Sequence, residues 1–260
     1  MTNSYALITG ASAGLGAEFA RQLARKGHNL VLVARREDKL QALAETLTAD
    51  YGVKVETIVA DLYAPSAPAF IAQSCDERGV EIDWLINNAG VAGPDLLLDR
   101  DWQEQQRFYQ LMMTAVAELC HRLIPAMLGR GYGRVINVAS VAGRIPRSGG
   151  CNYGPSKAYL VSLSEELNLT TAASGVHVCA LCPGFTHTDF HETAGLSAMK
   201  AGMPSWLWYT ADVVVKDAIE GVERGKPVVI SGRLYRYLDP LFQSVFTRRF
   251  FRIKARPNTD

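Results

Sequence analysis

Short runs of β-branched and other apolar residues alternate along this chain with longer segments of helical periodicity. Candidate strands begin at Tyr5, Asn29, Val53, Asp83, Gly133, Val176 and Pro227. The segments between them, such as residues 14–26 and 36–51, are long enough to form helices. This alternation predicts parallel βαβ units with right-handed crossovers. We therefore expect an α/β fold, a Rossmann-type doubly wound parallel sheet of about seven strands with helices on both faces.

Composition bounds the number of domains and the kinds of partner. A chain of 260 residues with 48% hydrophobic content can bury one large core, so we expect one domain over residues 1–260. The formal net charge of +1 argues against a nucleic-acid partner, because duplex-binding proteins usually carry a strongly basic face. The N-terminus, MTNSYALITGAS, lacks the pattern of a signal or transit peptide. No run approaches the roughly 18 uninterrupted apolar residues of a membrane span.

The five cysteines are an odd number without the spacing of a disulfide framework, which indicates a reducing, cytoplasmic setting. Cys179 and Cys182 have the spacing of a redox pair. They lie in a predicted strand, however, where residues three apart point to opposite faces. We interpret both as core residues, and we identify no metal-ligating cluster in the sequence.

The turn TGASAGLG, residues 9–16, follows the first predicted strand and opens the first predicted helix. Gly10, Gly14 and Gly16 allow a sharp turn and a close approach of the backbone to a ligand, and the helix N-terminus presents free N–H groups to a phosphate. A glycine-rich turn alone is also consistent with a plain tight connection. Its place between a strand and a helix favours dinucleotide binding.

The second predicted strand ends near Ala34 and is followed by Arg35 and Arg36. An enzyme that selects the unphosphorylated dinucleotide commonly has Asp or Glu here, which binds the ribose hydroxyls. Guanidinium groups instead bind a 2′-phosphate bidentately and stack on adenine. The alternative interpretation is that both arginines are solvated surface charges. Their position at the end of the strand favours NADP(H).

Together these motifs resemble those of the short-chain dehydrogenase/reductase family, in its NADP(H)-preferring type, over residues 5–231. The family's fourth-strand motif is present as Asn87, Asn88, Ala89 and Gly90. The resemblance implies three catalytic residues, Ser140, Tyr153 and Lys157. It also implies a cofactor-binding set of Gly10, Ser12, Gly14, Leu15, Gly16, Arg35, Arg36, Asp61, Leu62, Asn88, Ala89, Gly90, Tyr153, Lys157, Pro183, Gly184, Thr186 and Thr188. The implied reaction is hydride transfer between NADP(H) and a carbonyl compound or secondary alcohol.

Elementary chemistry supports the pairing of Tyr153 with Lys157. Residues at i and i+4 share a helix face, so the lysine can approach the region where the tyrosine works. A free phenol is poorly ionised at neutral pH, but a nearby ammonium group and the positive charge of the oxidised nicotinamide favour the phenolate. Tyr153 is then a competent general acid or base, and Ser140 is expected to hydrogen-bond the substrate oxygen.

One position departs from the pattern of the family. The family commonly completes a catalytic tetrad with an Asn, which helps to hold a helix irregularity and a water linked to the lysine. Counting back from Pro125 places Met112 at that position, and a thioether cannot donate a hydrogen bond. An alignment shifted by one turn would make Gln110 or Thr114 the relevant residue. The alternative function is therefore an NADP(H)-binding protein with weak or no turnover.

The substrate side is less specific. By resemblance, residues of about 189–209 form a lid, whose apolar side chains favour an apolar substrate or else pack the lid against the body. Residues of about 232–260 form a basic, aromatic C-terminal tail with seven Lys/Arg and two Asp/Glu. Such a tail is able to lie on an anionic membrane, but we favour packing against the pocket or a neighbouring subunit. The resemblance also implies a homodimer or homotetramer that acts on a small-molecule substrate.

Overall fold

All seven predicted strands are present and form one parallel sheet. The computed structural model describes residues 4–146, 151–186, 208–247 and 250. The strands are β1 Ser4–Thr9, β2 Asn29–Ala34, β3 Val55–Val59, β4 Glu81–Asn87, β5 Gly133–Val138, β6 Val176–Cys182 and β7 Val228–Ile230. Their order is β3-β2-β1-β4-β5-β6-β7, and every neighbouring pair is parallel. The predicted doubly wound sheet is therefore confirmed.

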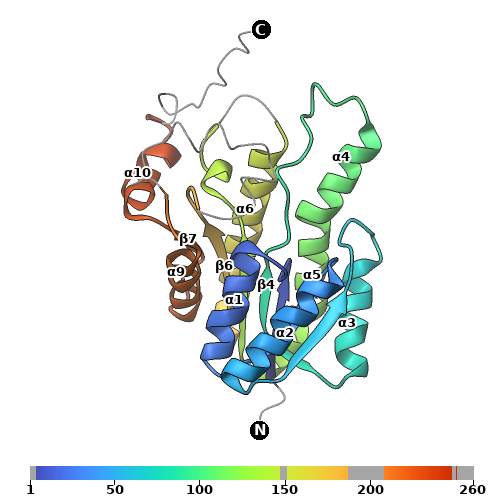
Figure 1. Ribbon diagram of the computed structural model, residues 1–260. Coiled ribbons are helices and arrows are strands. Elements are labelled where there is room, and N and C mark those ends of the chain that lie inside the picture. The colour runs from blue at the N-terminus through green and yellow to red at the C-terminus, as the bar shows by residue number, and fades with distance from the viewer. Residues whose placement is uncertain (1–3, 147–150, 187–207, 248–249, 251–260) are drawn as a thin grey trace.

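Helices cover both faces of the sheet (Figure 1). One face packs against α1 Gly14–Arg25, α2 Glu37–Tyr51 and α9 Ala211–Glu223. The other face packs against α3 Ala67–Glu77, α4 Trp102–Tyr109, α5 Ala115–Arg130 and α6 Tyr153–Thr171. A π-helical turn, η1 Gln110–Thr114, joins α4 to α5, and the 3-10 turns are η2 Val141–Gly143 and η3 Ala172–Ser174. Helix α10, Arg233–Gln243, follows the last strand.

The central strands are buried on both faces, which explains their nearly continuous apolar sequence. Along β1, Leu7 faces one core cluster and Ile8 faces the other. The same alternation separates the cysteines of β6, because Cys182 belongs to the first cluster and Cys179 to the second. Both thiols are free and fully buried. The interpretation of this pair as core residues is confirmed.

Local sequence explains where several helices begin and end. Helix α2 carries Glu37 and Asp38 in its first turn, where carboxylates interact favourably with the helix dipole. It ends at Gly52, whose φ of 67° lies in the left-handed region that favours glycine. Helix α5 ends in the same way at Gly131, with a φ of 68°. After each of these helices the chain turns and enters the next strand at the amino edge of the sheet.

The stretch Trp102–Arg130 is continuously helical over 29 residues, with a mean hydropathy of 1.3 in its most apolar window. Its length and composition alone are therefore compatible with a membrane span. Half of that window is buried inside the fold, however, and Phe108, Leu119 and Met127 belong to a core cluster. A helix packed against a sheet meets the same criteria, so this stretch carries no argument for a membrane.

The strand order reverses its direction between β1 and β4. The chain leaves β1 toward β2 on one side, whereas β4 lies on the other side of β1. Ligands of open α/β sheets bind outside such a reversal of strand order. The turn after β1 and the motif after β4 therefore meet at the place where a dinucleotide is expected.

Candidate functional site

The glycine-rich turn has the tight geometry predicted for it. Gly10 and Gly14 have φ angles of 64° and 55°, in the left-handed region. A Cβ atom on Gly10 would lie 2.9 Å from the Cα atom of Ala89, and one on Gly16 would overlap the carbonyl oxygen of Gly10. Larger residues are therefore excluded on steric grounds, and the turn forms a bare backbone cradle.

The N-terminus of α1 opens onto this cradle. Its N-cap residue is Ala13, and no side chain caps the first turn. The amide groups of a helix N-terminus carry a partial positive charge and bind anions. Beside them, the Arg36 Nη2 atom donates a hydrogen bond to the Ser12 Oγ atom at 2.9 Å. The cradle, the free amides and the guanidinium group together fit the phosphates of a dinucleotide.

Thr9 and Asn88 hold the turn after β1 against the motif after β4. The Thr9 Oγ1 atom accepts hydrogen bonds from the backbone amides of Asn88 at 3.0 Å and Ala89 at 3.1 Å. In return, the Asn88 Nδ2 atom donates to the carbonyl oxygens of Thr9 at 2.9 Å and Gly10 at 3.2 Å. Asn88 and Ala89 therefore fix the shape of the cradle.

The predicted adenine side contains two arginines around one ring. Arg35 lies 5.8 Å from the centroid of the Tyr63 ring, and Arg107 of α4 lies 5.1 Å from it. Asp61 stabilises this turn, because its Oδ1 atom accepts a hydrogen bond from the Tyr63 amide at 3.1 Å. Leu62 is buried beside it. Sequence reasoning missed Arg107, because α4 is remote in sequence and carries no motif.

Ser140 follows β5 and is the N-cap residue of η2, where its Oγ atom accepts a hydrogen bond from the Ala142 amide at 3.1 Å. The turn packs tightly against α6, because a Cβ atom on Gly143 would lie 2.7 Å from the Ala158 nitrogen. A Cβ atom on Gly154 would likewise lie 3.0 Å from the Ala142 oxygen. The backbone that carries Ser140 is thus fixed relative to the helix that carries Tyr153 and Lys157.

Tyr153 is the first residue of α6, and Lys157 lies one turn later. The Lys157 Nζ atom lies 5.6 Å from the centroid of the Tyr153 ring and donates a hydrogen bond to the Val138 carbonyl at 2.7 Å. Lys157 is only 4% exposed. Burial lowers the pKa of its ammonium group from 10.5 to about 8, because desolvation disfavours the charged form.

A chain of buried polar side chains fixes the start of α6. The Tyr109 hydroxyl donates to the Asn152 Oδ1 atom at 2.8 Å, and the Asn152 Nδ2 atom donates to the Gln105 Oε1 atom. Gln105 in turn donates to the carbonyl oxygens of Asp95 and Asp99. Asn152 immediately precedes Tyr153, so this chain positions the tyrosine from the α4 side. No motif in the sequence indicated it.

Met112, the residue that the alignment placed at the tetrad position, is buried in η1. Its sulfur accepts a hydrogen bond from the Val91 amide at 3.4 Å, and its side chain is 1% exposed. A Cβ atom built on Gly90 would lie 3.3 Å from that sulfur and 3.7 Å from the Lys157 Nζ atom. Met112 and Lys157 therefore border the same glycine. Thr114, one of the two alternatives, is exposed.

The segment after β6 adjoins the serine turn. The Val141 amide donates a hydrogen bond to the Pro183 carbonyl at 3.1 Å, and the Thr186 hydroxyl donates to the Gly184 carbonyl at 3.1 Å. Thr186 also forms a β-bridge with Tyr209. Thr188 lies outside the described residues, as does the predicted lid except for Trp208 and Tyr209.

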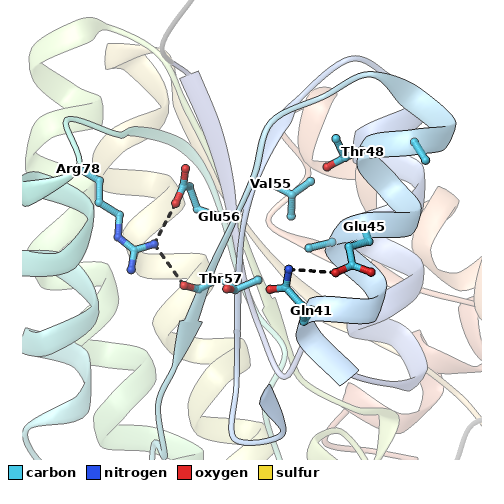
Figure 2. Close-up of a pocket in the computed structure, with 9 residues that line it drawn as sticks. Gln41, Glu45, Thr48, Val55, Glu56, Thr57 and Arg78 are labelled. Atoms are coloured by element: carbon cyan, nitrogen blue, oxygen red, sulfur yellow. Dashed lines mark hydrogen bonds and ion pairs between the residues drawn. The ribbon is translucent and has the colours of Figure 1, made fainter. Parts of the chain in front are cut away.

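Two hollows lie outside the described catalytic residues. One, of about 670 Å³, lies along the edge strand β3 between Gln41 of α2 and Arg78 (Figure 2). The Arg78 guanidinium group donates to the Glu56 carboxylate at 3.0 Å and the Thr57 carbonyl at 3.2 Å, as drawn in Figure 2. The second, of about 620 Å³, is bordered by Tyr63 and Arg107. The first is an edge-strand groove far from Ser140, and the second adjoins the adenine side.

Comparison with known proteins places this arrangement in a family. The family model described as "short chain dehydrogenase" matches residues 4–197. Sulfoacetaldehyde reductase 2 of Chromohalobacter salexigens is 33% identical over 186 residues, which are 71% of this chain and 73% of that protein. A short-chain dehydrogenase from Sphingobium yanoikuyae in complex with NADPH is 36% identical, with a TM-score of 0.81 and 90% of each chain covered. The bulky-bulky ketone specific alcohol dehydrogenase from Comamonas testosteroni is 30% identical, with a TM-score of 0.77 over 100% of this chain and 98% of that one. The chain belongs to the short-chain dehydrogenase family.

Proposed function

We propose that the protein is an NADP(H)-dependent oxidoreductase that interconverts a carbonyl compound and a secondary alcohol. The observation that carries the proposal is that Lys157 lies beside Tyr153 on α6, and that α6 packs tightly against the turn that carries Ser140. The membership of the family and the two related structures named above, one an NADPH complex and one a ketone-specific dehydrogenase, support it.

The residues present fit the proposed cofactor. The cradle of Gly10 and Gly16 and the N-terminus of α1 would receive the pyrophosphate, since no side chain caps that end of the helix. Arg36 and Ser12 receive the 2′-phosphate, because the guanidinium group already reaches the serine hydroxyl. The Pro183–Thr186 segment would receive the nicotinamide amide group. When bound, NADP(H) supplies or accepts a hydride at the nicotinamide ring.

The catalytic side chains then divide the proton chemistry. The Ser140 Oγ atom accepts from the Ala142 amide, so its own hydrogen remains available for the substrate oxygen. In reduction the Tyr153 hydroxyl gives a proton to that oxygen, and in oxidation the Tyr153 phenolate removes it. With a pKa of about 8, Lys157 is mostly protonated at neutral pH, and its charge stabilises the phenolate that Tyr153 becomes.

We also propose the class of substrate, the assembly and the location of the protein. The substrate is a small apolar carbonyl compound or alcohol, the assembly is a homodimer or homotetramer, and the location is cytoplasmic. The apolar residues that the sequence places at 189–209 support an apolar substrate. Light scattering of the purified protein tests the assembly.

The experiment compares Tyr153→Phe with the wild type on a panel of aliphatic, aromatic, steroid and acyl ketones, and it follows the oxidation of NADPH. The variant is expected to lose at least about a hundredfold in rate, the lower end of what general acid catalysis contributes. NADPH affinity, measured by fluorescence titration, is expected to stay within several-fold. A variant that retains more than about a tenth of the wild-type rate would exclude Tyr153 as the principal acid.

A second candidate function is a protein that binds NADP(H) but turns over poorly. The observation that favours it is the Met112 sulfur beside Gly90 and Lys157, where the family's amide would lie. Tight NADPH binding without measurable oxidation on the whole panel would favour this second function over the first.

A further inference from the structure

Helix α10 lies beyond the residues matched by the family model, yet it contacts the turn that carries Ser140. The Arg144 guanidinium group, directly after η2, forms a two-pronged ion pair with the Asp239 carboxylate. Both side chains are largely buried, with exposures of 14% and 15%. One helical turn later, the Gln243 Nε2 atom donates a hydrogen bond to the Arg144 carbonyl at 2.9 Å. The serine turn is therefore bound to α10 through both the side chain and the backbone of one residue.

The same helix also contacts the segment after β6. Tyr235 is 9% exposed, and its ring lies directly on Gly184, where any Cβ atom would overlap it. Tyr235, Asp239 and Gln243 recur every four residues, so they share one face of α10. That face meets the serine turn and the Pro183 segment at once, and the two segments are joined directly by the hydrogen bond from Val141 to Pro183.

Another side chain of α10 contacts a different helix. The Arg236 Nη2 atom forms an ion pair with the Asp217 carboxylate of α9 at 3.3 Å, and this pair is more exposed, at 56% and 31%. It touches neither Ser140 nor the Pro183 segment among the described residues. The helix thus carries two ion pairs of the same chemistry, one facing the catalytic turn and one facing α9.

We propose that Asp239 and Arg144 are positioning residues for the reaction, and that α10 holds Ser140 in place through them. This inference rests on the proposed function. A bidentate pair between a carboxylate and a guanidinium group fixes direction as well as distance. Removal of one partner leaves the other buried without a counter-charge, so the chain relaxes to solvate it. Here the chain that relaxes is the short turn that runs from Ser140 to Arg144.

The first experiment is a double-mutant cycle between Asp239→Asn and Ser140→Ala, with Arg236→Gln as the matched control. Asp239→Asn is expected to lower kcat by about tenfold, since a small misplacement of a catalytic group costs up to a hundredfold. NADPH affinity is expected to stay within about threefold, because the ion pair is remote from the cradle. In the Ser140→Ala background the same substitution is expected to have little effect, because the group that it positions is gone.

Two results of this cycle would overturn the proposal. One is an equal loss from Asp239→Asn with and without Ser140. The other is an equal loss from Arg236→Gln, which would point to general stabilisation of α10. Arg144→Lys, which keeps the charge but not the fork, is expected to lie between wild type and Asp239→Asn, and it supplies a milder variant if the latter folds poorly.

The second experiment does not depend on turnover. Amide hydrogen exchange in cofactor-free protein is expected to be faster for residues 139–145 in Asp239→Asn than in wild type or Arg236→Gln, with the exchange of β1 and β4 unchanged. Unchanged exchange in residues 139–145 would refute the positioning role whatever the kinetics show. A wild type that reduces no ketone in the panel would instead refute the proposed function, and the exchange result would still decide the role of Asp239.

Discussion

The buried ammonium group of Lys157 gives a prediction about stability as well as catalysis. Lys157→Met is expected to abolish turnover, because the phenolate of Tyr153 loses its neighbouring charge. In cofactor-free protein it is also expected to change how stability depends on pH. The substitution keeps an unbranched side chain of similar length at a site that is 4% exposed, so packing is largely preserved.

The sign of the effect follows from the lowered pKa. Lys157 has a pKa of about 8 in the folded protein, below its usual value of 10.5. Between these values the unfolded chain binds more protons, so the wild type gains stability as pH rises. The full penalty below pH 8 is about 3 kcal/mol, and most of it is lost between pH 7 and pH 10. The thioether side chain of the variant carries no charge at either pH, so the variant lacks this gain.

Urea unfolding of both proteins at pH 7, 8.5 and 10 measures the effect. The free energy of unfolding of wild type minus that of Lys157→Met is expected to rise by about 2 to 3 kcal/mol across this range, and titrations of all other groups cancel in the difference. Lys216→Met is the control, because Lys216 is 71% exposed, and its difference is expected to stay constant. A constant difference for Lys157→Met as well would refute the argument that burial depresses this pKa.

Three further outcomes are expected. Arg36→Ala weakens NADPH binding about tenfold and NADH binding little, because a charge-assisted contact to the 2′-phosphate is lost. Arg35→Ala weakens the binding of both cofactors alike. Fluorescence titrations measure these affinities, and an equal loss of NADPH and NADH affinity in Arg36→Ala would contradict the assignment. Met112→Asn raises the rate of ketone reduction at unchanged cofactor affinity in steady-state assays; a lower rate together with a lower Tm would mean that an unpaired amide had been buried. Deletion of residues 241–260 changes the oligomer mass or the substrate KM and leaves the fraction of protein that sediments with anionic liposomes nearly unchanged. The opposite result, in which the deletion abolishes a salt-sensitive binding to liposomes but alters neither assembly nor kinetics, would contradict this.

Much of the fold was predictable because its signals are local. Each strand of the sheet is a short apolar run. Each observed strand, from β1 to β7, overlaps the run that predicted it. The motifs after β1, β4, β5 and β6 fall at the carboxyl edge, because parallel strands bring all their carboxyl ends together. The order of the motifs in the sequence and the rule that parallel strands share one carboxyl edge were therefore enough to predict that these motifs lie together.

The contacts that sequence reasoning missed join segments far apart in the chain. Arg107 approaches Tyr63 across 44 positions, and Asp239 pairs with Arg144 across 95. A single charged residue on an amphipathic helix has no local signature of its partner, since its spacing is the same whether it meets solvent or a buried guanidinium group. The difference between Arg35 and Arg36 is of the same kind, because the hydrogen bond to Ser12 depends on how the strand meets the turn.

Met112 shows how far a resemblance carries chemistry from one chain to another. The family's Asn combines two roles, holding an irregular turn of helix and linking the lysine to a proton path. The irregular turn is retained here as the π-helical segment Gln110–Thr114, where the Met112 sulfur accepts the Val91 amide. A thioether is able to accept that bond weakly but has no hydrogen to donate. We therefore infer that the sulfur serves the backbone role, and the Met112→Asn variant tests whether a missing proton relay from Lys157 limits the rate.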